Sequence, residues 1–408
     1  MSDPLLTPEQ AQQLVLQDIP VLGVERVPLF DALGRVLAEG IAARHDNPPQ
    51  DNSAMDGYAL RHADIAGANA GQPVLLEVVE DIPAGHVPQK RVGPGQASRI
   101  MTGALVPEGA DTVIRVEDTR AEGKGVAILV PDSLGGNIRR RGSDVQTGQE
   151  VVGAGTLCGP GELALLASLQ RALVPVHRRP VVAILSTGDE LVEVDEPLAP
   201  GKIVNSNTYG LAALCLANGA IPLMLPIARD EEAQIRRAVQ SALSADLILS
   251  SGGVSVGDYD YVKKVLDELG AQARLWRVAM KPGKPLFFCV LQGKPYFGLP
   301  GNPVSSLVSF LQFVRPALRK AAGHLPDTWL LPALAAHLEH PLANEGDRRQ
   351  YVRARLRLEG GRLLAAAPQG QGSHQLSSML GTNGLLVLEP GVRLEAGGEV
   401  QAQLFGAL

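Results

Sequence analysis

Polar and glycine-rich segments that could bind an anion or a metal ion recur at four places between residues 180 and 322. Each follows a stretch predicted as a β-strand, and the four are residues 186–190, 250–260, 281–285 and 298–303. In an open parallel α/β sheet the carboxyl ends of the strands lie at one edge, and ligands bind there. We therefore expect the four segments to converge on one binding crevice.

The segment 250–260 is rich in glycine and serine and stands between a predicted buried strand and a predicted helix. The backbone N–H groups of Ser251, Gly252 and Gly253 could form a concave anion site, reinforced by the helix N-terminus. The spacing matches neither the G-x-G-x-x-G fingerprint of dinucleotide-binding proteins nor a Walker A loop, which disfavours both functions. An ordinary tight turn between a strand and a helix is the alternative interpretation.

Two lysines, Lys281 and Lys284, stand three residues apart in a loop that also contains Pro282 and Pro285. Because proline excludes a helix here, the two ammonium groups are expected to keep a defined separation. Such a pair suits a small dianion or a phosphate group. A solvated loop without a ligand is the alternative.

Carboxylates follow the same predicted strands. Glu190 comes after the first strand, next to Asp189, and Asp260 comes after a later one. Oxygen ligands beside a phosphate-binding loop suit Mg²⁺, so the carboxylates after these strands, Asp189, Glu190, Asp258 and Asp260, suggest a site for this metal. Asp230 has two interpretations: it contributes to the same site, or it is the N-cap of a helix over residues 231–243.

The first half of the chain contributes a second set of polar residues. Asp56 lies in a loop of small residues, Thr102 follows a predicted strand, and Arg139 begins a run of three arginines that ends close to Asp144. Arginines clustered in an acidic protein could bind phosphate through two hydrogen bonds each, although single surface arginines commonly face water. The last part of the chain has polar clusters at 347–349 and 372–374.

The elements expected to position these residues change in character along the chain. Thr7 as N-cap, Pro8 and Gln10 mark the first helix with a capping box. The predicted fold class is α/β multidomain: a doubly wound α/β domain, a mainly β domain, an N-terminal mixed helical domain and a C-terminal β-barrel-like domain. The expected boundaries are 1–47 with 146–179 for the N-terminal domain, 48–145 for the inserted mainly β domain, 180–326 for the α/β domain and 327–408 for the C-terminal domain.

Composition narrows the function classes. The 408 residues carry a formal net charge of -6 and 4% aromatic residues, which argues against binding to a nucleic-acid backbone or stacking on bases. Three cysteines without a C-x-x-C pair predict neither a disulfide framework nor a zinc site. The N-terminus lacks a signal-peptide pattern, and no apolar run reaches the roughly 18 residues of a membrane span. We therefore expect a cytoplasmic protein with no membrane or nucleic-acid partner.

Taken together, the polar segments resemble one known family. Residues similar to those of the bacterial MoeA family, and of the E domain of gephyrin and plant molybdenum-insertion proteins, occur in the family's order at 52–58, 100–104, 186–191, 250–260, 281–285 and 298–305. The similarity covers essentially the whole chain. It implies a homodimeric molybdopterin molybdenumtransferase of molybdenum cofactor biosynthesis. Such an enzyme inserts molybdenum from molybdate into adenylylated molybdopterin and releases AMP with the help of Mg²⁺.

The resemblance also implies roles for individual residues. The catalytic positions would be Asp56, Thr102, Asp144, Glu190, Asp230 and Asp260. Glu190 and Asp260 would be the metal ligands. The substrate-binding positions would be Arg139, Ser251, Gly252, Gly253, Lys281, Lys284, Pro300, Pro303, Arg348 and Ser373.

Some points of the resemblance are not fixed by the sequence. In two pairs of neighbours the functional residue stays open: Asp230 or Glu231, and Arg348 or Arg349. Ser143 departs from the family, which often has Glu at this position. In dimers of the family the mainly β domain of one subunit faces the α/β domain of the other. The resemblance therefore implies a site shared between two chains.

Two other functions remain as alternatives. A molybdopterin adenylyltransferase, which acts one step earlier, resembles residues 180–322 alone; it is also a candidate partner, together with proteins that mature molybdoenzymes. A non-catalytic scaffold is the second alternative, since the related gephyrin domain clusters receptors. Retention of Glu190, Asp260 and both lysines favours catalysis, because a scaffold could lose them.

Overall fold

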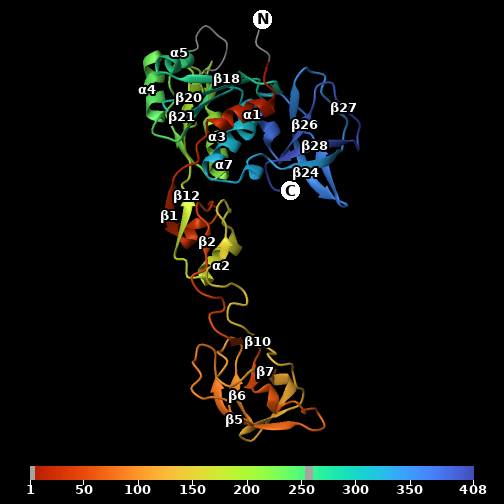
Figure 1. The fold of residues 1–408 in the computed structure, drawn as a ribbon. Coiled ribbons are helices and arrows are strands. Elements are labelled where there is room, and N and C mark those ends of the chain that lie inside the picture. Colours follow the sequence, from red (N-terminus) through yellow and green to blue (C-terminus); the bar gives the residue numbers. More distant parts are fainter. Residues whose placement is uncertain (1–4, 253–260) are drawn as a thin grey trace. The chain divides into compact units, whose positions relative to one another are not determined.

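The computed structural model describes residues 5–252 and 261–408 (Figure 1). The chain divides into two compact units. The first comprises residues 1–38, 155–159 and 173–408, and the second comprises residues 39–154 and 160–172. No helix in the described part of the chain is long and apolar enough to span a lipid bilayer.

The first unit is built around a six-stranded sheet. Its strand order is β16 (Ile221–Met224), β13 (Val181–Ser186), β17 (Leu247–Ser251), β21 (Lys294–Leu299), β20 (Pro285–Leu291) and β18 (Gln272–Arg277). The first four strands are parallel, and β20 and β18 are antiparallel to their neighbours. The parallel strands are aligned so that Ser186 lies opposite Ser251, and Ser251 opposite Leu299. Three strands therefore end at one edge.

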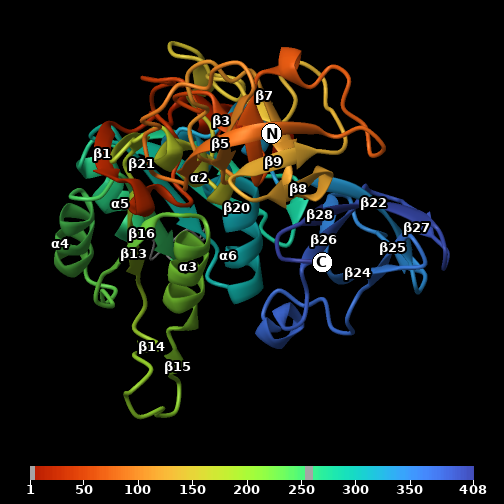
Figure 2. The same ribbon diagram turned by 90° about the horizontal axis from the view of Figure 1, so that it is seen from below.

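Helices cover both faces of this sheet. Along β13, Val182 and Ile184 belong to one core, and Ala183 and Leu185 belong to the other, because side chains alternate across a strand. The first core is completed by α1 (Pro8–Gln17), α3 (Ser206–Ala217), α6 (Pro303–Ser309), a π-helical turn (Phe310–Val314) and α7 (Arg315–Ala321). The second is completed by α4 (Glu232–Ala242) and α5 (Tyr261–Glu268). Figure 2 shows α3 beside α6 on one face, and the strand pair β14 (Leu191–Val192) and β15 (Ile203–Val204) leading into a loop. The predicted doubly wound sheet is confirmed.

The capping box predicted for the first helix is present. The Thr7 hydroxyl oxygen accepts a hydrogen bond from the Gln10 N–H at 3.2 Å, and the Thr7 N–H donates to Gln10 Oε1 at 2.9 Å. Ala11 and Val15 are fully buried on the inner face of α1, so the helix packs in the first core of the α/β sheet. A separate antiparallel pair, β1 (Val24–Pro28) with β12 (Leu173–His177), and the 3-10 turn Leu29–Ala32 also belong to the first unit.

The last part of the first unit forms a closed β-barrel. The hydrogen-bonded circle runs through β24 (Arg349–Glu359), β25 (Arg362–Ala366), β22 (Ala333–Leu338), β28 (Glu399–Leu404) and β26 (Gly384–Leu388), which pairs back with β24. A small pair, β23 (Leu342–Ala343) with β27 (Arg393–Leu394), and the 3-10 turns Pro326–Thr328 and Leu376–Met379 complete it. Strand β19 (Met280–Lys281) of the lysine loop pairs in parallel with β24. This pairing fixes the lysine loop against the barrel.

The second unit is mainly β, as predicted. Its sheet has the order β7 (Thr112–Arg115), β4 (Gly57–Leu60), β6 (Gln96–Ile100), β5 (Val74–Ile82), β9 (Gly125–Ile128) and β8 (Thr119–Glu122). Further elements are β2 (Ile41–Ala42) with β11 (Glu150–Val152), β3 (Asn52–Ser53) with β10 (Ile138–Arg139), helix α2 (Pro160–Ser168) and the 3-10 turns His62–Asp64 and Val116–Asp118. Gly57 is required in β4, because a Cβ there would lie 1.9 Å from the carbonyl oxygen of Ile114 in β7.

Candidate active site

A pocket of about 490 Å³ opens between the α/β sheet and the barrel of the first unit. The lysine loop and the start of α6 form one wall, and β24 with the loop 371–373 forms the other. Its lining residues are Lys281, Pro282, Gly283, Lys284, Pro285, Asn302, Ser305, Arg348, Gln350, Gln371, Gly372 and Ser373. Among the described residues, the lining holds three cations and no carboxylate, which makes it a site for an anion.

The lysine loop is held by a backbone pairing with β24 and by close packing at Gly283. In the β19–β24 pair Met280 lies opposite Arg349, and Lys281 lies opposite Gln350. Gly283 has a φ of 105°, and a Cβ there would lie 2.7 Å from Ser309 Oγ, so this position needs glycine. The side chains of Lys281 and Lys284 are exposed at the pocket. Neither lysine forms an ion pair with any residue that the structure describes.

The structure separates the two neighbouring arginines that the sequence left open. Arg348 lines the pocket and donates a hydrogen bond from Nη1 to the Met280 carbonyl oxygen at 3.2 Å. Arg349 instead forms ion pairs with Glu9 of α1 and, at 2.6 Å, with Glu389. Burial favours a lower pKa for Arg349, but the hydrogen bond with Glu9 and further interactions outweigh it and raise the pKa. Arg349 therefore connects α1 to the barrel, and Arg348 is the arginine at the pocket.

The loop that carries Ser373 depends on an arginine that the sequence analysis missed. Arg353 is only 1% exposed, and its guanidinium donates to the carbonyl oxygens of Gly370, Gln371 and Gly372 and to Ser378 Oγ. Burial lowers the pKa of Arg353 to about 10. Arg353 thus holds the loop 370–372 in the conformation that lines the pocket.

The loop is also tied to α6. The Ser373 carbonyl oxygen accepts a hydrogen bond at 3.1 Å from the N–H of Val304, in the first turn of that helix. Pro303 occupies the first position of α6, where a missing N–H costs nothing. Asn302 and Ser305 from this turn line the pocket beside Ser373.

A cluster of carboxylates lies after β13. The N–H of Asp189 donates to Asp230 Oδ2 at 3.3 Å, and the N–H of Asp230 donates to Asp189 Oδ1 at 3.2 Å. Burial and the negative charges of Asp189 and Glu190 raise the pKa of Asp230. The three carboxylates therefore lie close enough to repel one another, which is the setting in which a bound cation is stabilising.

The prediction that Asp230 caps the following helix is wrong. Helix α4 begins at Glu232, the N-cap position is Glu231, and neither carboxylate accepts a capping bond from the helix. The side chain of Glu231 accepts a hydrogen bond from Gln234 Nε2 at 2.9 Å instead. Asp230 is thus the residue of this pair that lies in the carboxylate cluster with Asp189 and Glu190.

The glycine-rich loop is joined to its neighbours at the same edge of the sheet. Asn207, in the first turn of α3, donates from Nδ2 to Ser251 Oγ at 2.7 Å and to the Gly301 carbonyl oxygen at 2.8 Å. The N–H of Gly252 donates to the Leu299 carbonyl oxygen at 3.2 Å, and the buried Pro300 follows directly. Asn207, which was not predicted from the sequence, connects two of the polar segments, 250–260 and 298–303.

Two of the predicted site residues, Gly253 and Asp260, lie outside the described residues, and their roles stay predictions. In residues 5–252 and 261–408 no three His, Cys, Asp or Glu side chains are arranged to hold a metal ion. Mg²⁺ commonly binds through one or two carboxylates together with the phosphates of a ligand. The described cluster fits that mode.

The second unit holds the remaining predicted residues. Both the N–H and the hydroxyl of Thr102 donate to Asp56 Oδ1 at 2.7 Å, and these hydrogen bonds lower the pKa of Asp56. Asp144 accepts a hydrogen bond from Asn47 Nδ2 at 2.8 Å. Asp56 and Thr102 are therefore brought together as a pair.

The three consecutive arginines of the second unit differ in their partners. Arg140 pairs with Asp51 at 2.6 Å, and Arg141 pairs with Asp46. Arg139 lies in β10 opposite Asn52, and its exposed side chain has no acidic partner in the described chain. Arg139 is therefore the arginine of the run that remains available to a ligand.

The fold and these polar groups define a class: a multidomain α/β protein with an anion pocket and a carboxylate cluster at the carboxyl ends of its strands. Comparison with known proteins identifies the family. Three family models match the chain: "MoeA N-terminal region (domain I and II)" at residues 6–169, "Probable molybdopterin binding domain" at 183–320, and "MoeA C-terminal region (domain IV)" at 335–405. The chain belongs to the MoeA family, as predicted.

Curated relatives and solved structures agree with this assignment. A molybdopterin molybdenumtransferase of Nostoc sp. is 44% identical over 90% of this chain and 85% of the relative. One of Bacillus subtilis is 39% identical over 93% of this chain and 89% of the relative. The crystal structure of the molybdopterin biosynthesis MoeA protein from Pyrococcus horikoshii OT3 has a TM-score of 0.84 and 32% identity, and the match covers 98% of this chain and 100% of that one.

Proposed function

We propose that the chain inserts molybdenum from molybdate into adenylylated molybdopterin and releases AMP. The observation that carries this proposal is the pocket lined by Lys281, Lys284 and Arg348, with no carboxylate from residues 5–252 or 261–408 in its lining. Molybdate is a small tetrahedral dianion, so three fixed cations with the Ser373 hydroxyl nearby give it charge neutralisation and hydrogen bonds. The dithiolene sulfurs of the pterin would make the bonds to molybdenum, so no protein nucleophile is needed.

The adenylylated pterin is proposed to bind along the carboxyl edge of the sheet. Ser251, Gly252 and Gly253 would contact its phosphates through backbone N–H groups. Pro300 and Pro303 would shape the wall between this edge and the pocket. Support comes from Asn207, whose hydrogen bonds join Ser251 to the carbonyl of Gly301, next to the pocket residue Asn302.

Mg²⁺ is the proposed cofactor, with Glu190 and Asp260 as its ligands and Asp230 beside them. The fit rests on the chemistry of the described carboxylates: the charges of Asp189 and Glu190 contribute to the raised pKa of Asp230, and a divalent cation would relieve their repulsion. When bound, Mg²⁺ would neutralise charge on the pyrophosphate that is cleaved as AMP leaves. The protein's own part is to position the phosphates and exclude other orientations.

We further propose a homodimer whose sites combine residues of two chains. Asp56, Thr102, Arg139 and Asp144 of one chain would complete the site formed by the α/β domain of the other. Self-association is supported by the outermost strand β16, which pairs with no further strand of the described chain and exposes Ile221, Leu223 and Met224. Asp56→Ala and Lys281→Ala are each expected to be impaired when molybdate is kept well below its KM. They should then regain activity when they are refolded together, and no regained activity would contradict shared sites.

The cellular setting of the activity is also a proposal. We infer a cytoplasmic location, supported by the scarcity of cysteine, which is typical of reducing compartments. A molybdopterin adenylyltransferase would supply the substrate, and maturation proteins of molybdoenzymes would receive the product.

The proposed reaction is tested with purified protein, adenylylated molybdopterin and Mg²⁺, with and without molybdate. We expect AMP release, measured by chromatography, to rise when molybdate is added. AMP release that does not respond to molybdate would favour the scaffold alternative. Adenylylation of molybdopterin from ATP would favour the adenylyltransferase, but matches to the N-terminal and C-terminal MoeA regions argue against it.

A further inference from the structure

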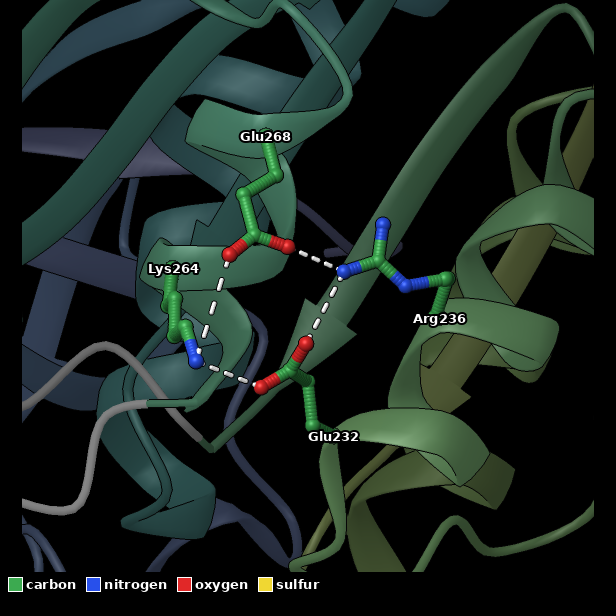
Figure 3. Close-up of polar contacts among 4 residues, drawn as sticks. All are labelled: Glu232, Arg236, Lys264 and Glu268. Atoms are coloured by element: carbon green, nitrogen blue, oxygen red, sulfur yellow. Dashed lines mark hydrogen bonds and ion pairs between the residues drawn. The ribbon is translucent and has the colours of Figure 1, made fainter.

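Four charged side chains form a closed ring between α4 and α5 (Figure 3). Lys264 Nζ lies 2.6 Å from Glu232 Oε2 and 3.9 Å from Glu268 Oε1, and Arg236 contacts Glu268 and lies 3.0 Å from Glu232 Oε1. Positive and negative groups alternate, so each side chain has two partners of opposite charge. The hydrogen bond with Lys264 lowers the pKa of Glu232 and raises that of Lys264.

The ring holds a part of α4 that apolar packing does not reach. Glu232 is the first residue of α4, whereas the first buried residue of this helix is Ile235. From Ile235 onwards α4 shares a core with Val262 and Val265 of α5. The start of α4 is therefore fixed to α5 by the ion pairs of Glu232 and Arg236.

The first turn of α4 is in turn connected to the carboxylate cluster. Gln234 accepts a hydrogen bond from the Arg229 N–H at 3.3 Å and donates to Glu231 Oε2 at 2.9 Å. It therefore binds both chain neighbours of Asp230. Asp230 then exchanges two hydrogen bonds with Asp189. A shift of the first turn would consequently move Asp230 relative to Asp189 and Glu190.

We propose that the ring of Glu232, Arg236, Lys264 and Glu268 is a positioning clamp that holds Asp230 in place for a divalent cation. The inference rests on the proposed function, since it assumes a cation at the carboxylate cluster. Exposed ion pairs contribute little to stability, about 0.2–1 kcal/mol each. Four mutually dependent charges can nevertheless restrict the position of a helix end, and an interaction near a metal ligand affects metal affinity more than global stability.

The test compares two substitutions with opposite effects on charge. Glu232→Gln removes a negative charge, and Lys264→Gln removes a positive one, so a simple field effect would weaken cation binding in the first variant and strengthen it in the second. A clamp predicts weaker binding in both, by about three- to tenfold. The double variant should bind the cation no more weakly than the single variant with the lower affinity, because the residues act as one unit. Arg237→Gln, on the exposed side of α4, is the matched control.

Binding of Mn²⁺ alone, as a spectroscopic substitute for Mg²⁺, is measured by electron paramagnetic resonance without substrate. Weaker binding in both single variants, with an unchanged control and unchanged melting temperatures, supports the clamp. Tighter binding in Lys264→Gln, or no change in either variant, overturns the clamp while the metal site stands. Absence of Mn²⁺ binding to the unmodified protein overturns the proposed metal site and the clamp with it. Binding unaffected by Asp230→Asn overturns the clamp alone, because Glu190 and Asp260 are the proposed ligands.

Discussion

Replacing Lys281 by glutamine tests the anion pocket most specifically. The side chain lines the pocket and has no described acidic partner, so its charge is free to serve a ligand. A hydrogen bond to a charged group contributes about 1.5–3 kcal/mol, and the exposure of Lys281 favours the lower half, about 1.5–2 kcal/mol. This loss corresponds to a rise of about ten- to thirtyfold in the KM for molybdate.

The assay is steady-state AMP release at varied molybdate and, separately, at varied adenylylated molybdopterin. We expect the KM for molybdate to rise and the KM for the pterin substrate to stay within about twofold, because the lost charge serves only one ligand. Lys124→Gln, at an exposed lysine between β8 and β9, is the matched control and should change neither value. An equal rise in both KM values would mean that Lys281 binds phosphate, and no change in either would refute the pocket assignment.

Three further predictions concern the acidic groups and the buried arginine. Asp260→Ala should lower kcat by about a hundredfold or more without changing the melting temperature, since it removes a proposed metal ligand; normal turnover would refute the metal assignment. Arg353→Met should lower the free energy of unfolding by about 1–3 kcal/mol and raise the KM for molybdate, because it leaves loop carbonyls without donors; an intact KM would show that the loop does not depend on Arg353. Without divalent cations, Asp230→Asn should raise the free energy of unfolding at pH 7, whereas Asp56→Asn should lower it. Because the pKa of Asp230 is raised, this residue contributes stability at low pH that is lost as the pH rises through that pKa. Because the pKa of Asp56 is lowered, this residue contributes stability at higher pH that is lost as the pH falls through that pKa. Chemical denaturation at pH 3 and pH 7 measures both changes in the free energy of unfolding.

Much of the fold was predictable because local signals and tertiary packing agree. The run Val181–Ser186 is apolar at every position but the last, and it became the buried strand β13 with cores on both faces. The capping box of Thr7 and Gln10 set the start of α1. The barrel was predicted only as barrel-like, because its closure depends on pairing between β24 and β26, far apart in sequence.

Convergence of the lysine loop with the last domain was predicted from resemblance, and the pocket geometry agrees with it. The choice between Arg348 and Arg349 needed the structure, because only the fold shows that Arg349 is already paired with Glu9 and Glu389. The role of Asp230 also needed the structure. An aspartate before a helix is commonly its N-cap, and the two hydrogen bonds between Asp230 and Asp189 join residues far apart in sequence.

Arg353 was not predictable from its strand. In β24, Arg353, Arg355 and Arg357 alternate with Ala354 and Leu356, a pattern that places all three arginines on a solvent-exposed face. Arg355 is indeed exposed, but the loop 370–378 covers the strand at Arg353 and makes it fully buried. A loop that approaches from 17 residues away leaves no mark in the local pattern.

In the proposed reaction, fixed cations of the pocket hold the molybdate while acidic side chains of the sheet edge serve the nucleotide half of the substrate. Crystals soaked with molybdate and AMP, measured at the molybdenum absorption edge, test it directly. We expect an anomalous peak within hydrogen-bond distance of Lys281, Lys284 and Arg348. A peak elsewhere on the protein, with that pocket empty at saturating molybdate, would contradict it.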